Sequence, residues 1–177
     1  ELCNSNGPSF QFQEKQHTTG TAAGSQTATP ATPHLLTNIA VVGLGYVGLP
    51  LSLQFAKSGV KVLGLDIDPT KVEALNRGQS YIKHITPEAV ADAVKPGQFS
   101  ASTDFRRVAE VDAVVICVPT PLNKNREPDI SYILSTGKTI APYLRRGALV
   151  VLESTTYPGT TEDDLREVLE AGSGLKA

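Results

Sequence analysis

Three glycines, Gly43, Gly45 and Gly48, stand in the sequence GLGYVG, and Asp66 follows roughly 20 residues later. A glycine can turn the chain tightly, can let a phosphate approach the backbone, or can let a helix lie close to a strand. We assign these three roles to Gly43, Gly45 and Gly48, in that order. A helix that starts at such a turn offers free N–H groups and the positive end of its dipole to phosphates. The spacing therefore predicts a site for the diphosphate of a dinucleotide.

Asp66 ends the second apolar run, where dinucleotide sites carry the acid that binds the adenosine ribose. Its carboxylate can accept hydrogen bonds from both ribose hydroxyls, and it would repel a 2′-phosphate by on the order of several kcal/mol. Asp66 therefore predicts NAD rather than NADP, the alternative being a solvated acid at a strand end. Lys71 can reach the adenosine side from the next helix, although an exposed, solubilising lysine is the competing interpretation.

The elements that must position these residues alternate between short apolar runs and amphipathic segments. Strands are predicted over residues 38–42, 61–66, 99–102, 112–118 and 148–153. Helices are predicted over about residues 46–58, 68–78, 86–97, 103–111, 129–144 and 160–172. This alternation predicts an α/β fold with a Rossmann-type, doubly wound parallel sheet. The usual sheet has about six strands, so we expect this one to lack the last strand of the full domain.

Helix start signals support these boundaries. Asp68 and Thr86 are predicted N-caps, and each precedes a proline, which suits the first helical position. Thr160 or Thr161 is expected to cap the last helix in the same way.

Residues 1–34 differ from the rest of the chain in composition. They are rich in Ser, Thr, Gly, Gln and Ala, and are predicted to form a flexible leader without secondary structure. Residues 35–177 are predicted to form the dinucleotide-binding domain. The chain contains no methionine and begins with Glu1, from which we expect a processed, tagged or excised piece of a longer protein.

The bulk composition argues against several classes of partner. The 177 residues have a formal net charge of −2 and no dense basic cluster, so we expect no nucleic-acid surface. No apolar stretch approaches the roughly 18 residues of a membrane span, and no signal peptide is visible. The two cysteines, Cys3 and Cys117, form no metal motif, and Cys117 is interpreted as a small buried hydrophobic residue. A reducing cytoplasm fits this cysteine content, and no metal is expected.

Two further segments leave the predicted sheet at the carboxyl ends of its strands, where ligands bind in such folds. CVPTPL, residues 117–122, follows the fourth strand, and ESTTYPGTTE, residues 153–162, follows the fifth. Thr120 offers a hydroxyl and a carbonyl between two prolines. Three consecutive hydroxyl residues, Ser154 to Thr156, stand directly at a strand end, which a helix cap alone does not explain.

Taken together, GLGYVGLPL, Asp66, VPTPL and ESTTYPGTTE resemble the N-terminal domain of the UDP-glucose/GDP-mannose dehydrogenases over about residues 38–171. SYIKHI, residues 80–85, and ESTTYPGTTE are most similar to the branch that oxidises UDP-N-acetylglucosamine or UDP-N-acetylmannosamine at C6. The resemblance implies an NAD-dependent, four-electron oxidation of a sugar C6 alcohol to the uronate with two NAD molecules, for polysaccharide precursor synthesis. It also implies a homo-oligomeric full-length enzyme.

The resemblance also implies the site residues. It places the adenosine and the diphosphate on Gly43, Leu44, Gly45, Tyr46, Val47, Gly48, Asp66 and Lys71. It places the path toward the nicotinamide along Val118, Pro119, Thr120, Pro121, Leu122, Glu153, Ser154 and Thr155. Thr155 matches the family threonine that helps to hold a water near the reacting carbon, and it is the one catalytic residue predicted here.

The remaining family machinery comprises a cysteine nucleophile in a glycine-rich motif, a lysine, an asparagine and one or more acids, and none of them is assigned in this chain. A thiolate is needed to trap the aldehyde intermediate, and neither Cys3 nor Cys117 stands in that motif. We therefore expect the chain alone to be inactive, with the UDP-sugar bound by other domains. Two alternatives stay open: another Rossmann dehydrogenase, of the 3-hydroxy acid type, and a non-catalytic NAD-sensing module.

Overall fold

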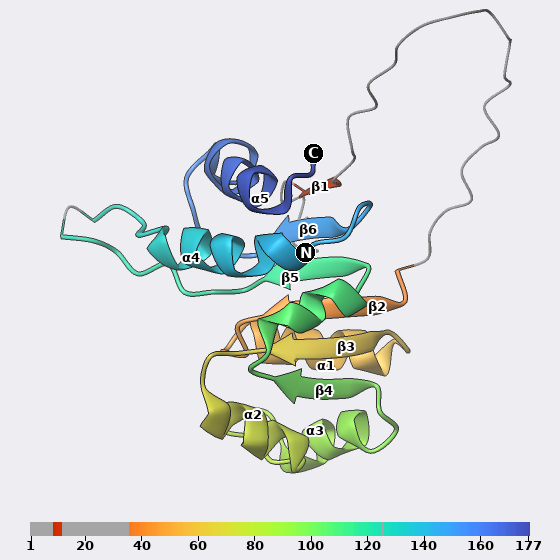
Figure 1. Ribbon diagram of the computed structural model, residues 1–177. Helices are drawn as coiled ribbons and strands as arrows, with labels where there is room; N and C mark the ends of the chain where they lie inside the picture. Colours follow the sequence, from red (N-terminus) through yellow and green to blue (C-terminus); the bar gives the residue numbers. More distant parts are fainter. Residues whose placement is uncertain (1–8, 12–35, 125) are drawn as a thin grey trace, which may run out of the picture.

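One sheet organises the part of the chain that the structure describes, residues 9–11, 36–124 and 126–177 of a computed structural model. Its strands are β1 (Ser9–Gln11), β2 (Asn38–Val42), β3 (Lys61–Leu65), β4 (Phe99–Ser102), β5 (Ala113–Ile116) and β6 (Leu149–Leu152). They lie in the order β1-β6-β5-β2-β3-β4 (Figure 1). Strands β2 to β6 are parallel to one another, whereas β1 pairs with β6 in the antiparallel sense. The predicted α/β fold with five parallel strands is confirmed.

Helices connect the parallel strands. The α-helices are α1 (Gly48–Lys57), α2 (Pro69–Asn76), α3 (Pro87–Val94), α4 (Ser131–Ile140) and α5 (Arg166–Ser173). Two 3₁₀ helices, η1 (Phe105–Glu110) and η2 (Ala141–Tyr143), and one π-helical stretch, η3 (Thr160–Leu165), complete the described elements. None of these helices combines the length and the apolar character that crossing a bilayer requires.

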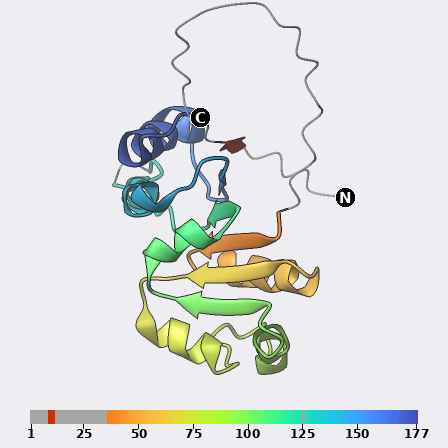
Figure 2. The ribbon, with the colours of Figure 1, turned by 45° about the vertical axis from the view of Figure 1, so that its right-hand side comes forward.

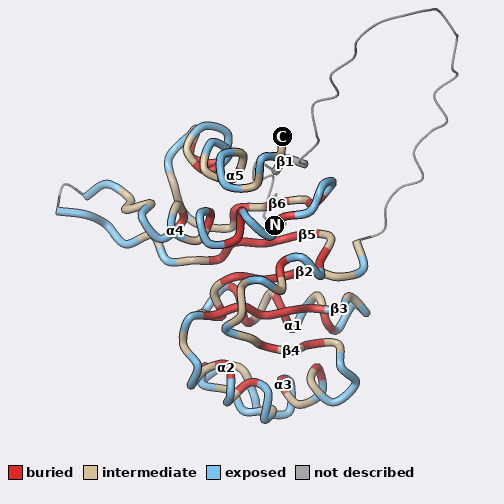
Figure 3. The backbone as a smooth tube through the Cα atoms, in the orientation of Figure 1, coloured by how far each residue is buried: buried red, intermediate tan, exposed pale blue. Residues whose placement is uncertain are grey.

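Two buried layers, one on each face of the sheet, hold the fold together. Side chains alternate between the faces along a strand, so Val41 and Val42 of β2 belong to different layers. One layer packs against η1, α4 and α5, and the other against α1, α2 and α3. Figure 2 shows the sheet between these two sets of helices, and Figure 3 shows the buried residues concentrated along the strands. This two-sided burial explains why the strand sequences are continuous apolar runs.

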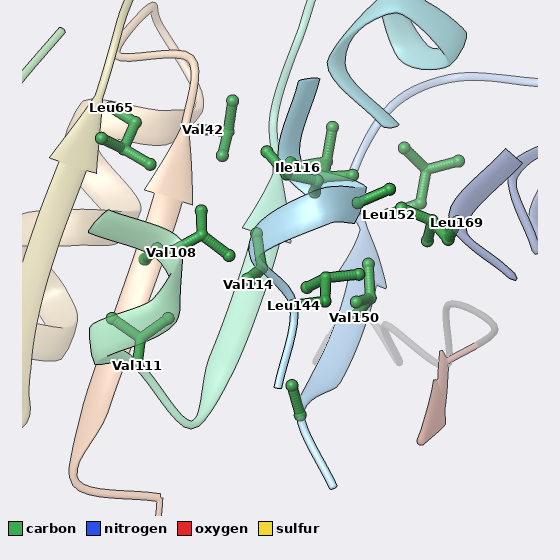
Figure 4. Close-up of a cluster of buried hydrophobic side chains, with 14 of the residues drawn as sticks. Val42, Leu65, Val108, Val111, Val114, Ile116, Leu144, Val150, Leu152 and Leu169 are labelled. Carbon is green, nitrogen blue, oxygen red and sulfur yellow. The ribbon is translucent and has the colours of Figure 1, made fainter. Parts of the chain in front are cut away.

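Figure 4 shows how the first layer is built. Residues of four parallel strands meet residues of the covering helices and of the segments beside them. The labelled strand residues are Val42, Leu65, Val114, Ile116, Val150 and Leu152, and the labelled residues opposite them are Val108, Val111, Leu144 and Leu169. Because each helix packs on the sheet through such contacts, the strand ends and the turns that follow them are held in fixed positions.

The predicted start signals of α2 and α3 are confirmed. The Asp68 carboxylate accepts a hydrogen bond of 2.9 Å from the backbone N–H of Thr70, and the Thr86 hydroxyl accepts one of 3.3 Å from that of Ala89. Pro69 and Pro87 occupy the first positions of their helices, where no N–H is needed.

Three expectations need correction. The last helical region starts as a π-helix after Gly159, and neither Thr160 nor Thr161 caps it, because the Thr160 hydroxyl instead donates to the Tyr157 carbonyl. The short helix before β5 is a 3₁₀ helix. The leader was expected to have no secondary structure, but β1 lies within it and covers the outer edge of β6. The rest of the predicted leader lies outside the described residues.

The strand order fixes where a ligand can bind. The chain runs from β2 to β3 and β4 on one side of the sheet, and then crosses to β5 and β6 on the other side. At such a reversal, the connections from neighbouring strands leave in opposite directions and open a crevice at the carboxyl ends. The turn after β2 and the loop after β5 flank this crevice.

Candidate dinucleotide-binding site

A cavity of about 1560 Å³ lies at the carboxyl ends of the parallel strands. It is lined by the turn between β2 and α1, the end of β3 with the start of α2, the loops after β5 and β6, one side of α4, and residues of η1 and η3. Its volume exceeds the roughly 300–1,000 Å³ of common small-molecule pockets. The cavity therefore has room for an extended ligand such as a dinucleotide.

Each of the three glycines at the β2–α1 turn lacks a side chain for a different structural reason. Gly43 has φ of +91°, and a Cβ atom there would lie 2.6 Å from the carbonyl oxygen of Cys117. A Cβ atom on Gly48 would lie 1.8 Å from the carbonyl oxygen of Gly43, so this glycine lets α1 start close to the turn. A Cβ atom on Gly45 would meet no protein atom within 4 Å. Because Gly45 lines the cavity, its missing side chain leaves space for a ligand.

The same turn presents backbone donors. Among the described residues, the N–H groups of Gly45, Tyr46 and Val47 donate no hydrogen bond. The side chains of Tyr46 and Val47 are exposed, at 76% and 58%, and both line the cavity. Since these groups stand directly before the N-terminus of α1, the turn is suited to a diphosphate.

Asp66 is buried at the end of β3, with 6% of its surface exposed. Its Oδ2 atom accepts a hydrogen bond of 2.9 Å from the Leu44 N–H, and its Oδ1 atom accepts one of 3.0 Å from the Asp68 N–H. The Lys71 ammonium lies 3.7 Å from Oδ2. An ionised carboxylate has about four acceptor positions, so each oxygen keeps a lone pair for a ligand hydroxyl.

The loops after β5 and β6 are joined by one side-chain contact. The Ser154 hydroxyl donates a hydrogen bond of 2.9 Å to the Val118 carbonyl. Thr155, the next residue, is exposed and lines the cavity. Ser154 therefore fixes the shape of the cavity wall, whereas the Thr155 hydroxyl is available to a bound molecule.

The structure brings most of the predicted site residues to one cavity. Those that line it are Gly43, Gly45, Tyr46, Val47, Asp66, Lys71, Val118, Pro119, Thr120, Pro121, Glu153, Ser154 and Thr155. Leu44, within the turn, and Gly48, the first residue of α1, are buried and do not line the cavity. Leu122 is 66% exposed, lies outside the lining and forms a bridge with Pro128.

Cys117 is buried behind the turn, as expected for a small apolar residue. Burial, with a smaller contribution from the Glu153 charge, raises the pKa of its thiol to about 12. The thiol therefore stays protonated at neutral pH and is a poor nucleophile. Within the described ranges no three His, Cys, Asp or Glu side chains are grouped as metal ligands would be.

Sequence reasoning missed several residues of the cavity wall. Ile67 follows Asp66, is 82% exposed and lines the cavity beside it. An apolar residue directly after the acid was a signal that could have pointed to an adenine contact. On η1 and α4 the lining residues are Phe105, Tyr132, Ser135, Thr136 and Thr139, whose small or aromatic side chains form no recognisable motif. The strand ends and the segment after β6 add Val42, Leu65, Cys117, Leu152 and residues 156–162.

Comparison with known proteins identifies the family of the chain. The family model described as UDP-glucose/GDP-mannose dehydrogenase family, NAD binding domain, matches residues 37–177. The UDP-N-acetyl-D-mannosamine dehydrogenase of Escherichia coli (strain K12) is 44% identical over 127 residues, which are 70% of this chain and 29% of that protein. The UDP-N-acetyl-D-glucosamine 6-dehydrogenase of Pseudomonas aeruginosa is 35% identical over 138 residues, 78% of this chain and 32% of that protein.

Solved structures agree with the sequence matches. The NDP-N-acetyl-D-galactosaminuronic acid dehydrogenase of Methanosarcina mazei Go1 superposes with a TM-score of 0.75 at 40% identity, covering 80% of this chain and 32% of that one. A ternary complex of GDP-mannose dehydrogenase from Pseudomonas aeruginosa superposes with a TM-score of 0.73 at 33% identity, covering 78% and 33%. The chain thus spans about a third of the length of the relatives it matches.

Proposed function

The chain belongs to the UDP-glucose/GDP-mannose dehydrogenase family, as its NAD-binding domain, and on this premise we propose that its cavity holds the NAD of a nucleotide-sugar 6-dehydrogenase. One observation carries the proposal. Gly45 has an ordinary φ, and no protein atom occupies the space of its missing side chain, so the fold itself does not require glycine there. A ligand that approaches the backbone closely does require it.

The residues around the turn fit a dinucleotide. The unpaired N–H groups of Gly45, Tyr46 and Val47 would donate to the diphosphate, and the start of α1 adds the positive end of its dipole. Asp66 would accept the hydroxyls of the adenosine ribose. Lys71, already paired with Asp66, would lie beside the same ribose.

The electrostatics of this corner support NAD over NADP. Asp66 is buried, accepts two backbone hydrogen bonds and lies 3.7 Å from the Lys71 ammonium. A 2′-phosphate would bring a second negative charge against this carboxylate, and Lys71 is the one cation that lines the described cavity. Like-charge contacts of this kind cost on the order of several kcal/mol, or about a hundredfold in affinity.

For the whole protein, we propose oxidation of the C6 alcohol of a UDP-sugar to the carboxylate. Bound NAD supplies a hydride acceptor, and removal of four electrons consumes two NAD molecules. The Thr155 hydroxyl, exposed at the cavity wall, would hold a water near the reacting carbon. The thiolate that carries the second oxidation is not Cys117, since that thiol is buried and protonated.

The substrate proposal rests on the relatives. Two of them are named as UDP-N-acetyl-D-mannosamine and UDP-N-acetyl-D-glucosamine dehydrogenases, so we propose a UDP-N-acetylhexosamine. We further propose a role in polysaccharide precursor synthesis, a cytoplasmic location and a homo-oligomeric full-length enzyme. The match of residues 37–177 to this family's model favours this proposal over the two alternatives, a 3-hydroxy acid dehydrogenase and an NAD-sensing module.

Calorimetric titration of the chain with NAD, NADP and a UDP-N-acetylhexosamine tests the proposal. We expect measurable binding of NAD, binding of NADP weaker by about a hundredfold, and little binding of the nucleotide-sugar. Absence of NAD binding by the folded chain would contradict the cofactor assignment. Equal affinity for NADP would contradict the role of Asp66.

A further inference from the structure

The segment that follows α2 lies against the turn between β2 and α1. The Tyr81 hydroxyl donates a hydrogen bond of 2.5 Å to the carbonyl oxygen of Leu44. The ring of His84 stacks on the ring of Tyr46, with centroids 6.0 Å apart and planes inclined by 26°. A stretch about 40 residues away in sequence thus contacts the glycine-rich turn twice.

The Tyr81 contact completes the fixation of Leu44. The Leu44 side chain is fully buried and packs beside Gly64 of β3, where a Cβ atom would lie 2.9 Å from it. Its N–H donates to Asp66, and its carbonyl accepts from Tyr81. The side chain and both polar backbone groups of this residue are therefore held from different directions.

The orientation of one peptide unit follows from this fixation. The carbonyl of Leu44 and the N–H of Gly45 belong to the same peptide, and the structure has no cis peptide bond among its described residues. In a trans peptide these two groups point in opposite directions. The Tyr81 hydroxyl therefore makes the Gly45 N–H point away from Tyr81, and Gly45 itself lines the cavity.

Tyr81 acts from outside the cavity. It does not line the cavity wall, and its ring lies under the Lys71 ammonium, 5.9 Å from the ring centroid. Lys71 in turn pairs with Asp66, and Asp66 accepts from Leu44, so the four residues form a closed set of contacts. Burial, with the nearby Asp66 and Asp68 charges, raises the pKa of the Tyr81 hydroxyl, so it keeps the proton that it donates.

We propose that Tyr81 is a positioning residue for the cofactor: its hydroxyl holds the Leu44–Gly45 peptide in the orientation that presents the turn's N–H groups to the diphosphate. The proposal rests on the NAD site proposed above. It adds a residue that touches no ligand and that acts only through the backbone of the turn.

The test compares three ligands on the Tyr81→Phe variant. The substitution removes the hydroxyl and keeps the ring under Lys71. NAD and ADP both carry a diphosphate, whereas adenosine does not. Loss of the one hydrogen bond that orients the diphosphate donors is expected to lower the affinity for NAD and for ADP by about tenfold. The affinity for adenosine, measured by NMR titration, is expected to stay unchanged. Tyr143→Phe, a partly exposed tyrosine outside the cavity, is the matched control and is expected to bind all three ligands normally.

The outcomes separate the two proposals. If the unmodified chain binds no NAD, the proposed function fails. If the unmodified chain binds NAD, and the Tyr81→Phe variant binds NAD and ADP as tightly as the unmodified chain does, the positioning role is wrong. An equal loss for adenosine would place Tyr81 in the adenosine pocket, which also overturns the positioning role. A variant that is unfolded at the assay temperature, by circular dichroism, would make the hydroxyl structural and overturn it too.

Discussion

The buried carboxylate of Asp66 accepts a hydrogen bond of 2.9 Å from the backbone N–H of Leu44, and this bond joins the end of β3 to the turn that follows β2. One residue therefore shapes the turn proposed to bind the diphosphate and would also provide the acceptor for the neighbouring ribose. Any substitution of Asp66 is expected to affect both parts of the site. The size of each effect depends on whether the new side chain keeps an acceptor.

Asp66→Asn is the most informative substitution at this position. The amide keeps the shape and one acceptor, so the free energy of unfolding is expected to fall by only about 1 kcal/mol. The charge that repels a 2′-phosphate is lost, so the ratio of NAD to NADP affinity is expected to fall by at least about tenfold. Calorimetric titration of both cofactors measures this ratio. Asp92→Asn, an exposed acid on α3, is the control that should leave it unchanged.

Gly45→Ala separates ligand binding from folding. The new methyl group has no protein atom within 4 Å, so stability is expected to stay equal or to rise by up to about 1 kcal/mol. The methyl group would occupy the diphosphate space, and overpacking of about 1–3 kcal/mol corresponds to a loss of NAD affinity of about 10- to 100-fold. Thermal unfolding and calorimetry report the two effects separately.

The matched control for Gly45→Ala is Gly97→Ala, at the end of α3. Gly97 has φ of +75° and also has open space around a Cβ atom. This variant is expected to lose about 1 kcal/mol of stability through backbone strain, and to bind NAD normally. Normal NAD binding by Gly45→Ala would mean that no phosphate approaches this backbone.

Unlike Gly45→Ala, the Gly48→Ala substitution is expected to destabilise the fold itself. Its Cβ atom would lie 1.8 Å from the carbonyl oxygen of Gly43, and backbone cannot move aside as a side chain can. We expect a loss of about 3 kcal/mol in the free energy of unfolding, measured by urea denaturation. A variant as stable as the parent would show that the turn and α1 can separate without cost.

The Cys117 thiol is expected to be unreactive in the folded chain. With a pKa of about 12, about one thiol in ten thousand is ionised at pH 8. Alkylation by iodoacetamide at pH 8, followed by peptide mapping that distinguishes Cys117 from Cys3, should leave Cys117 unmodified. In urea the same thiol should react readily. Rapid modification of the native chain would mean that the turn opens frequently.

The sequence was sufficient to predict the elements whose signals are local. The run NIAVV became β2 with the predicted bounds, because a strand covered on both faces is apolar throughout. The Asp68 and Thr86 caps were predictable for the same reason, since a cap and its partner lie within three residues. The glycine motif and Asp66 located the cavity, because the fold always brings these two strand ends together.

Two kinds of contact could not be predicted, the choice between competing local partners and the pairing of segments far apart in sequence. Thr160 or Thr161 was expected to cap the last helix, but the Thr160 hydroxyl donates backward to the Tyr157 carbonyl, and the sequence does not distinguish a cap from such a contact. The antiparallel pairing of β1 with β6 joins segments about 140 residues apart and has no periodic signal. The bond from Tyr81 to Leu44 likewise depends on how the segment after α2 folds back over the turn.

A crystal structure of the chain with NAD at saturating concentration would locate the bound diphosphate directly. We expect the diphosphate about 3 Å from the N–H groups of Gly45, Tyr46 and Val47, with the adenosine ribose hydroxyls on Asp66. NAD bound at another part of the surface, or a diphosphate turned away from Gly45, would show that the proposed cofactor site is wrong.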